Sequence, residues 1–413
     1  MKESLHYCSP AHGGWGPIRM TQLVPESQLL FCCPSACFRH GALGAFQHGY
    51  KNRMAYLYLT REDIIRGYDD ILLEGAEEYL CRLEGRLKVL FLFVSCLDDF
   101  IGTDLEAILA ELSERHPDIM FRACHMNPIA ADTKLPPLVT AYQSMMSLLP
   151  IAETKQRAVG LFGTNVKLPE SSDLRILLNR IGEELIELPD MEDFASFQRL
   201  GAVRAAIITE PYAKPGASRL AERNRIPALF QPVSYSLSEI KQNYEALGQA
   251  LGHDFSGELI DWEEKAKAEI AKTREALGEL PLLISDSAVR RPFALAETLH
   301  AYGFCVREVS LSKLLPIERE AKTRLSESLP SLRIREALAP ERTLDYAQQE
   351  RSDTLAIGSE VAYYAGSRHL LDLASDEGMY GYDGLIRLMR SLRESAAEEA
   401  DLRTSIEAYG GIV

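Results

Sequence analysis

Short apolar runs alternate with longer amphipathic stretches along most of this chain. The apolar runs are rich in β-branched and aromatic residues, which predicts strands. The stretches between them repeat their apolar residues with the period of a helix. Strands that alternate with helices are typical of parallel sheets covered by helices, so the pattern predicts an α/β fold. The predicted strands are residues 88–95, 119–124, 158–163, 205–209, 281–285, 304–309 and 354–358.

Helix starts and breaks divide these elements into domains. Residues 103–106 (Thr-Asp-Leu-Glu) and 236–239 (Ser-Leu-Ser-Glu) each match a capping box, which predicts helices that begin there. Breaks are expected at residues 149–150 and in the charged helical region 257–278. A chain of 413 residues suits two or three domains of ordinary size. We predict three Rossmann-like domains, at residues 1–155, 156–255 and 256–413.

Charge and hydropathy exclude two classes of partner. The chain has 45 Lys and Arg against 60 Asp and Glu, a net charge of −15. This charge repels phosphate backbones and anionic lipid surfaces, so we expect neither nucleic acid nor membrane as a partner. The start of the chain does not resemble a secretory signal, and the longest apolar run, 89–97, is far shorter than the ~20 residues that span a bilayer. A cytoplasmic protein is expected.

The cysteines are concentrated near the start of the chain, with six of the eight in the first hundred residues. In a reducing compartment, clustered thiols are poor candidates for a disulfide framework and plausible metal ligands. Cys8 shortly precedes Gly13, Gly14 and Gly16. Glycine-rich backbone can approach a recessed iron-sulfur cluster without a side-chain clash. Cys8 is therefore a predicted ligand.

Two further cysteines occupy positions that suit a ligand. Cys37 follows the apolar residues 29–31 and is expected at a turn from a strand to a helix. Cys96 follows the apolar run 89–95, which reads as a fully buried strand. The carboxyl ends of parallel strands face the crevice where α/β folds bind ligands. We predict that Cys37 and Cys96 join Cys8 at one metal centre.

The remaining cysteines have simpler interpretations. Cys32 and Cys33 are consecutive, so on a strand they point to opposite faces and at most one can join the site. Cys33 is a more plausible additional ligand than Cys32. Cys81 is expected to pack on an amphipathic helix, and Cys124 and Cys305 are expected in the core.

Zinc is the rival metal. Cys8 with His12, and Cys33 with Cys37, could supply a tetrahedral set of ligands. The short Cys-x2-Cys pairs of zinc ribbons are absent from the sequence, however, and a structural zinc ion would not explain Cys96.

Several segments resemble the nitrogenase component 1 superfamily. Residues 33–37 (Cys-Pro-Ser-Ala-Cys) stand where that family has a Gly-Pro-x-Gly-Cys turn. Residues 96–104 resemble its Cys-x4-Ile-Gly-Asp-Asp segment, and residues 381–384 read Gly-Tyr-Asp-Gly. The resemblance extends over essentially the whole chain. Cys8 and Cys37 are 29 positions apart and Cys37 and Cys96 are 59 apart, spacings closer to those of the β-type subunit than of the cofactor-bearing α-type.

The resemblance implies a shared metal centre. Cys8, Cys37 and Cys96 would hold one half of an iron-sulfur cluster at a subunit interface. The cluster would be a P-cluster-like [8Fe-7S] cluster, or a [4Fe-4S] cluster as in simpler relatives. The implied partners are a homologous, cofactor-bearing α-type subunit in an α2β2 assembly, and a separate ATP-dependent iron-sulfur reductase that docks transiently.

The chain departs from the family where the large catalytic cofactor is held. In the catalytic subunit that cofactor is bound by one Cys in the middle domain and one His near the C-terminus. No cysteine occurs here between Cys124 and Cys305, the matching middle segment is 230–235, and Tyr380 precedes Gly-Tyr-Asp-Gly. Neither a residue of segment 230–235 nor Tyr380 is a plausible substitute ligand. We predict no large cofactor and no catalytic residue in this chain.

No Walker-type phosphate loop is present, so ATP would be hydrolysed by another protein.

These observations favour an electron-relaying, β-type subunit of a nitrogenase-like reductase. Among relatives, methylthio-alkane reductase, which cleaves C–S bonds reductively, is the favoured parent enzyme. A component of a tetrapyrrole reductase is one alternative, and a scaffold or maturation protein for clusters is another. A metal-free α/β protein with incidental cysteines is the third.

Polar residues near the cysteines have expected supporting roles. Asp98 and Asp99 precede a predicted helix and should complement its N-terminal dipole. His125 is expected to be a hydrogen-bonded structural residue. Three basic residues could tune the potential of a cluster: Arg19, His12 and His40.

Overall fold

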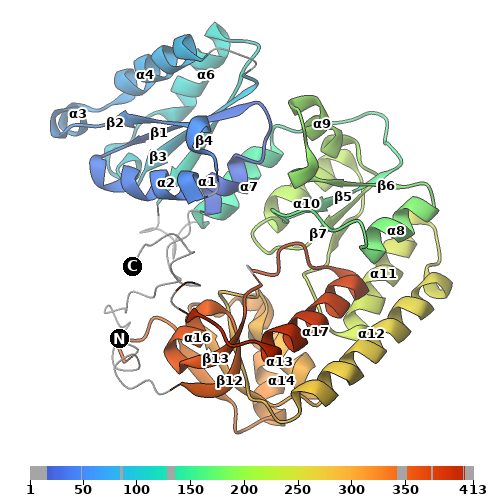
Figure 1. The fold of residues 1–413 in the computed structure, drawn as a ribbon. Coiled ribbons are helices and arrows are strands. Elements are labelled where there is room, and N and C mark those ends of the chain that lie inside the picture. Colours follow the sequence, from blue (N-terminus) through green and yellow to red (C-terminus); the bar gives the residue numbers. More distant parts are fainter. Residues whose placement is uncertain are drawn as a thin grey trace. The chain divides into compact units, whose positions relative to one another are not determined.

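The structure is a computed structural model, and it describes residues 16–47, 49–83, 87–127, 135–341, 351–373, 375–402 and 404. In this part of the chain, three parallel β-sheets are flanked by helices (Figure 1). The predicted α/β class is confirmed. The described residues form two compact units. The first unit contains residues 16–167 and 182–232, and the second contains residues 168–181 and 233–404.

The first sheet, in the first unit, has the strand order β2-β1-β3-β4. Its central strand β3 is buried along its whole length, which explains its uninterrupted apolar sequence. Alternate side chains of the sheet enter two cores, one beneath α1 and α7 and the other beneath α4 and α6 (Figure 1). The strands are β1 (Ser27–Cys33), β2 (Met54–Tyr58), β3 (Val89–Ser95) and β4 (Met120–Met126). The helices are α1 (Gly16–Thr21), α2 (Ser35–Gln47), α3 (Arg61–Arg66), α4 (Asp69–Arg82), α5 (Asp98–Ile101), α6 (Leu105–Arg115) and α7 (Pro137–Met146), with a 3-10 turn at Lys51–Arg53.

The second sheet belongs to the same unit and has the order β6-β5-β7-β8. The core under α7 continues through α10 into this sheet, so both sheets of the first unit share one apolar interior. The strands are β5 (Ala158–Phe162), β6 (Glu184–Glu187), β7 (Ala205–Ile208) and β8 (Ala228–Phe230). The helices are α9 (Phe194–Gln198) and α10 (Lys214–Asn224), with 3-10 turns at Leu188–Asp190 and Arg199–Ala202.

The third sheet forms the centre of the second unit, with the order β11-β10-β9-β12-β13. Two long helices, α12 and α17, pack against each other, and the Thr273 hydroxyl donates a 3.0 Å hydrogen bond to the Met389 carbonyl across their contact. The strands are β9 (Leu282–Ser285), β10 (Val306–Leu311), β11 (Arg333–Glu336), β12 (Ser352–Ile357) and β13 (Ser367–Leu371). The helices are α8 (Asp173–Arg180), α11 (Leu237–Leu251), α12 (Ser256–Leu277), α13 (Pro292–Ala301), α14 (Arg319–Ser328), α16 (Ser359–Ala365) and α17 (Gly381–Ala397), with a 3-10 turn at Pro316–Glu318.

Each predicted strand overlaps an observed one. Strands β2 and β11, which were not predicted, are partly exposed, whereas the buried β1 was anticipated only as the apolar run before Cys37. No helix in the described residues is both long enough and apolar enough to cross a bilayer. The three sheets fall within the ranges 1–155, 156–255 and 256–413, and the boundaries of those three domains stay predictions.

One predicted helix start is confirmed and one is wrong by a residue. The Ser236 side chain accepts from the Glu239 backbone N–H, as expected for the start of α11. At α6, the cap is Asp104 and not Thr103, because the Asp104 carboxylate accepts the Ala107 N–H at 3.0 Å. An aspartate at this position also complements the helix dipole.

Candidate metal centre

The first sheet brings Cys37 and Cys96 to one edge. Strands β1 and β3 are parallel neighbours, with Cys32 opposite Val94, so both strands end at the same edge. Cys96 directly follows β3. Helix α2 begins two residues after β1, and Cys37 is its third residue. The prediction that Cys37 lies at a turn from a strand to a helix is confirmed.

The two thiols are close enough to interact electrostatically. Burial raises the pKa of the Cys37 thiol, and the negative charge of the Cys96 thiolate raises it further. Both residues are only partly buried. The structure therefore brings two of the three predicted ligands together. The third, Cys8, lies outside the described residues, as does His12, and the His40 side chain is also not described.

Cys32 and Cys33 occupy opposite faces of β1, as predicted. Cys33 belongs to the core beneath α1 and α7, and Cys32 belongs to the core beneath α4 and α6. Burial raises the pKa of Cys33, and the charges of Cys37 and Cys32 add to that effect. Burial, followed by the charges of Asp98 and Asp63, raises the pKa of Cys32 to about 12. Both thiols are therefore neutral in the unmetallated chain.

Three other cysteines can be compared with their predictions. Cys124 is buried in the core, as expected, and burial raises the pKa of its thiol. Cys81 is exposed on α4, so the prediction that it packs is wrong. It lies in the last turn of α4, beyond the buried residues Leu72 and Ala76. Cys305 is only partly buried and lies just before β10.

Asp98 and His125 are in contact at the same edge of the sheet. The buried Asp98 begins α5, and its Oδ2 lies 3.0 Å from Nδ1 of His125, the residue that β4 places opposite Val94. Asp99 accepts a hydrogen bond from the Asn127 side chain. Asp98 and Asp99 lie in the first turn of α5, where the expected interaction with the helix dipole applies, and Asp98 also contacts His125 across the end of the sheet. The prediction of a hydrogen-bonded His125 is confirmed.

The donors at this edge suit iron and sulfide but form an incomplete set. Among the described residues, no group of three or more His, Cys, Asp or Glu side chains could hold a metal ion. Two neighbouring cysteine thiols are the soft ligands that iron-sulfur clusters require. A cluster held here would need further ligands, such as Cys8 and thiolates from a second chain.

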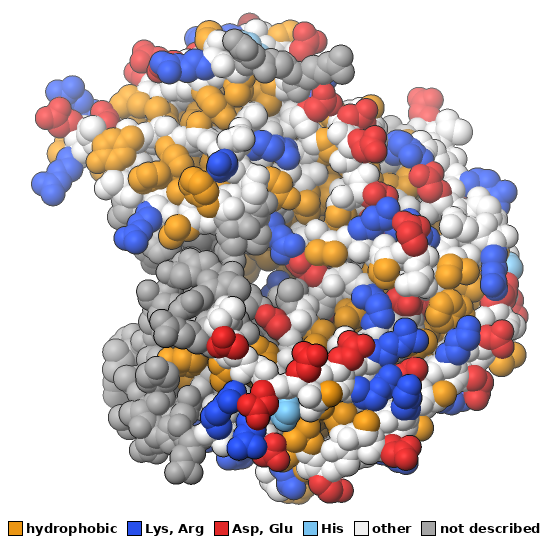
Figure 2. Space-filling view, viewed as in Figure 1, with side chains coloured by type: hydrophobic (Ala, Val, Ile, Leu, Met, Phe, Trp, Pro, Cys, Tyr) orange, Lys and Arg blue, Asp and Glu red, His pale blue; other side chains and the backbone are white. Residues whose placement is uncertain are grey.

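Exposed apolar side chains surround the same edge. Phe38 follows Cys37 on α2, Tyr58 ends β2, Ile65 lies on α3 and Phe100 lies on α5. Their exposed fractions are 39%, 57%, 84% and 75%. Figure 2 shows hydrophobic side chains gathered over the part of the surface formed by the first sheet and its helices. Single exposed apolar residues are common but clustered ones are not, so these side chains form a candidate surface for association.

The Gly-Tyr-Asp-Gly segment has a different environment. It begins α17, and Asp173 accepts hydrogen bonds from the backbone N–H groups of Tyr382 at 2.8 Å and Asp383 at 3.3 Å. Tyr244 stacks on Tyr382 at 6.1 Å and meets Tyr380 edge-on at 6.3 Å. Tyr380 is thus part of a packed aromatic group around a carboxylate. The sequence offered no signal for Asp173 or Tyr244, because both lie far from the motif along the chain.

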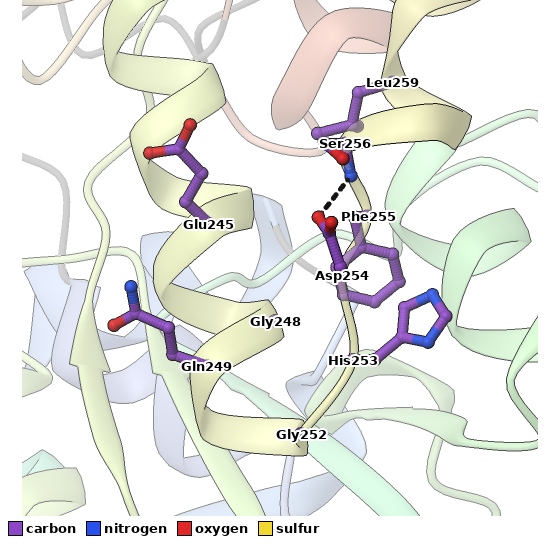
Figure 3. A pocket seen from close by; sticks show the side chains of 9 residues that line it. All are labelled: Glu245, Gly248, Gln249, Gly252, His253, Asp254, Phe255, Ser256 and Leu259. Atoms are coloured by element: carbon purple, nitrogen blue, oxygen red, sulfur yellow. Dashed lines mark hydrogen bonds between the residues drawn. The ribbon is translucent and has the colours of Figure 1, made fainter.

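A pocket of about 410 Å³ lies between α11 and the start of α12 (Figure 3). Its carboxylates are Glu245 and Asp254, and Asp254 accepts the Ser256 backbone N–H at 2.9 Å. His253 is held by Glu258, with 3.1 Å between Nε2 and Oε1. The pocket contains no thiol and belongs to the second unit. It is distinct from the cysteine edge.

Comparisons with known proteins identify the family. The model for nitrogenase component 1 type oxidoreductases matches residues 14–396. The solved structure of nitrogenase Cp1 at pH 6.5 aligns with a TM-score of 0.75 at 12% identity, over 96% of this chain and 94% of that chain. The structure of nitrogenase Cp1 at pH 5 aligns with a TM-score of 0.65 at 12% identity, over 100% of this chain and 91% of that chain. No curated protein matches. The chain shares the fold of these structures and belongs to the family of nitrogenase component 1 type oxidoreductases.

Proposed function

We propose that this chain is the electron-relaying, β-type subunit of a nitrogenase-like reductase. The observation that supports this most strongly is the pair Cys37 and Cys96, half-buried at one edge of the first sheet and close enough to interact. With Cys8 they would hold half of an iron-sulfur cluster, P-cluster-like [8Fe-7S] or [4Fe-4S]. Such a cluster, when bound, accepts and donates single electrons.

The chain's own residues would control the surroundings of that cluster. The apolar core beneath Cys37 excludes water from one side of the site. The Asp98–His125 pair fixes a polar group at the end of the neighbouring strands, where it can set the local charge. The chain works in the cytoplasm under this proposal, where thiols stay reduced.

A partner subunit would complete the site. The exposed Ile65 and Phe100 suit a second chain that covers this edge. We propose a homologous, cofactor-bearing α-type subunit in an α2β2 assembly, and a separate ATP-dependent iron-sulfur reductase as the electron donor. The favoured parent activity is reductive C–S cleavage of methylthio-alkanes.

The packing around Tyr380 supports the view that this chain holds no large cofactor of its own. The Tyr380 ring packs within an aromatic group, and burial raises the pKa of its phenol, which opposes metal ligation as a phenolate. Substrate reduction would then occur on the partner subunit.

Two alternatives use the same cysteines. A tetrapyrrole-reductase component would relay electrons in the same way to another substrate. A scaffold or maturation protein would release its cluster to an acceptor. Anaerobic purification of the chain with its co-expressed partner, followed by EPR, separates an electron relay from a scaffold. A relay subunit keeps its cluster and is reduced by the ATP-dependent reductase. Transfer of the cluster to an acceptor protein would contradict the relay, and a metal-free complex would contradict both.

A further inference from the structure

Cys33 and Cys37 lie on the same face of the first sheet. Cys33 is the last residue of β1, two positions after Phe31, so both side chains point to the core beneath α1. Helix α2 crosses this face: a Cβ atom placed on Gly41 would come within 3.3 Å of Phe31 and Ile18. Cys37 is one helical turn before Gly41 and therefore shares its side of the helix. This arrangement places the Cys37 thiol over the end of β1, next to Cys33.

The contacts of the two thiols agree with this placement. Cys33 is a buried member of the core, and Cys37 packs against that core from α2. The backbone N–H of Cys37 donates a 3.1 Å hydrogen bond to the Pro34 carbonyl, so the intervening residues form a tight turn. Cys32 is as buried as Cys33 but faces the opposite core.

We propose that Cys33 and Cys37 form a reversible disulfide in the chain that carries no cluster. This bond would remove Cys37 from the ligand set until it is reduced, a consequence that rests on the proposed function. A disulfide is neutral and apolar, so it suits the buried position of Cys33. Cys37 also interacts with Cys96, so a Cys37–Cys96 bond is the competing product that the test must distinguish.

The chemistry is a thiol–disulfide exchange with a low-molecular-weight disulfide such as oxidised glutathione. The more accessible Cys37 attacks first as the thiolate, which breaks the small disulfide, forms a mixed disulfide at Cys37 and releases one small thiol. Cys33 then loses its proton and attacks the Cys37 sulfur, which releases the second small thiol. Two protein thiols are oxidised to one disulfide, and one small disulfide is reduced to two thiols. The disulfide keeps Cys37 from irreversible oxidation, because a thiol reductant reverses it.

The test uses the full chain, prepared anaerobically without metal and then treated with oxidised glutathione. Trypsin releases residues 20–39 as one peptide, because no Lys or Arg lies between Arg19 and Arg39. This peptide contains Cys32, Cys33 and Cys37. After alkylation, we expect a peptide with one alkyl group, on Cys32, and two hydrogens fewer than the reduced form. Fragment masses locate the bond in the wild-type chain without any variant.

Two matched variants sharpen the result. Cys33→Ala should abolish the disulfide and accumulate glutathione on Cys37, whereas Cys32→Ala, which truncates an equally buried neighbour, should retain the disulfide. Three alkyl groups on the wild-type peptide, or a bond between Cys37 and Cys96, would overturn the proposal. The mass readout needs no metal, so an iron-free wild-type complex would contradict only the proposed function.

Discussion

The Asp173 carboxylate accepts the backbone N–H of Tyr382 at 2.8 Å, although the two residues lie 209 positions apart. This contact fixes the start of α17 against α8 in the second unit. Burial raises the pKa of Asp173 to about 6, and the hydrogen bonds from Tyr244, Tyr382 and Asp383 only partly offset that effect. The position before Gly-Tyr-Asp-Gly is therefore held by a structural carboxylate and an aromatic group.

Asp173→Asn should destabilise the chain by about 1–3 kcal/mol at pH 4, because an amide cannot accept both backbone N–H groups as well as a carboxyl does. The folded pKa of Asp173 is raised above the value of 3.8 for an unperturbed aspartate. Its contribution to the free energy of unfolding is therefore complete below about pH 4 and is lost as the pH rises through about 6. The difference in unfolding free energy between wild type and Asp173→Asn should then narrow, by at most about 3 kcal/mol. Urea unfolding at pH 4, 5, 6 and 7 measures this difference. A gap that widens with pH would contradict the raised pKa.

Gly381→Ala should destabilise the second unit by more than about 2 kcal/mol. Gly381 has φ of 62°, and a Cβ atom there would lie 2.6 Å from the Asp173 carboxylate oxygens and the Tyr244 hydroxyl. Thermal unfolding of the variant measures the effect. Gly257→Ala is the matched control, because nothing lies within 4 Å of its new Cβ atom and α12 should gain up to about 1 kcal/mol in helix propensity. Equal effects at the two positions would show that the space around Gly381 is not restricted.

Cysteine accessibility should follow the burial of each thiol. Cys81 is exposed and should react with iodoacetamide fastest, whereas Cys124, whose thiol is buried and has a raised pKa, should react only on unfolding. Timed alkylation of the reduced, metal-free chain with peptide mass spectrometry gives the order. Rapid reaction of Cys124 in the native chain would contradict the packing of β4.

The apolar edge should govern assembly and not folding. Ile65→Lys changes a side chain that is 84% exposed, so the melting temperature should change little. Association with the co-expressed partner should weaken at least about tenfold if the patch is buried in the complex. Ile260→Lys is the control, because Ile260 is also largely exposed but lies on α12 in the second unit. Size-exclusion chromatography and co-purification report the association. Equal loss with both variants would argue against this edge as the interface.

The sequence predicted the features that depend on local pattern. The continuous apolar run of β3 predicted both a buried strand and the position of Cys96 at its end, because the fold fixes which end of a parallel strand faces the ligand crevice. Because side chains alternate between the two faces of a strand, the sequence also predicted that Cys32 and Cys33 face opposite cores. Features that depend on tertiary contact were missed. The Asp98–His125 pair joins α5 to β4, and nothing near Asp173 in the sequence points to Tyr382. The cap of α6 was misplaced because Thr103 and Asp104 are both good caps and only the backbone decides between them.

The central claim is that Cys37 and Cys96 hold a cluster shared with a partner subunit. The most direct measurement is the iron and acid-labile sulfide content of the anaerobically purified complex, for wild type, Cys37→Ala, Cys96→Ala and the exposed control Cys81→Ala. We expect the iron of the shared cluster, about eight atoms per pair of chains for an [8Fe-7S] cluster, to be present in wild type and in Cys81→Ala and to be mostly lost in both ligand variants. Zinc in place of iron, no metal in the wild-type complex, or full iron in Cys96→Ala would contradict the account.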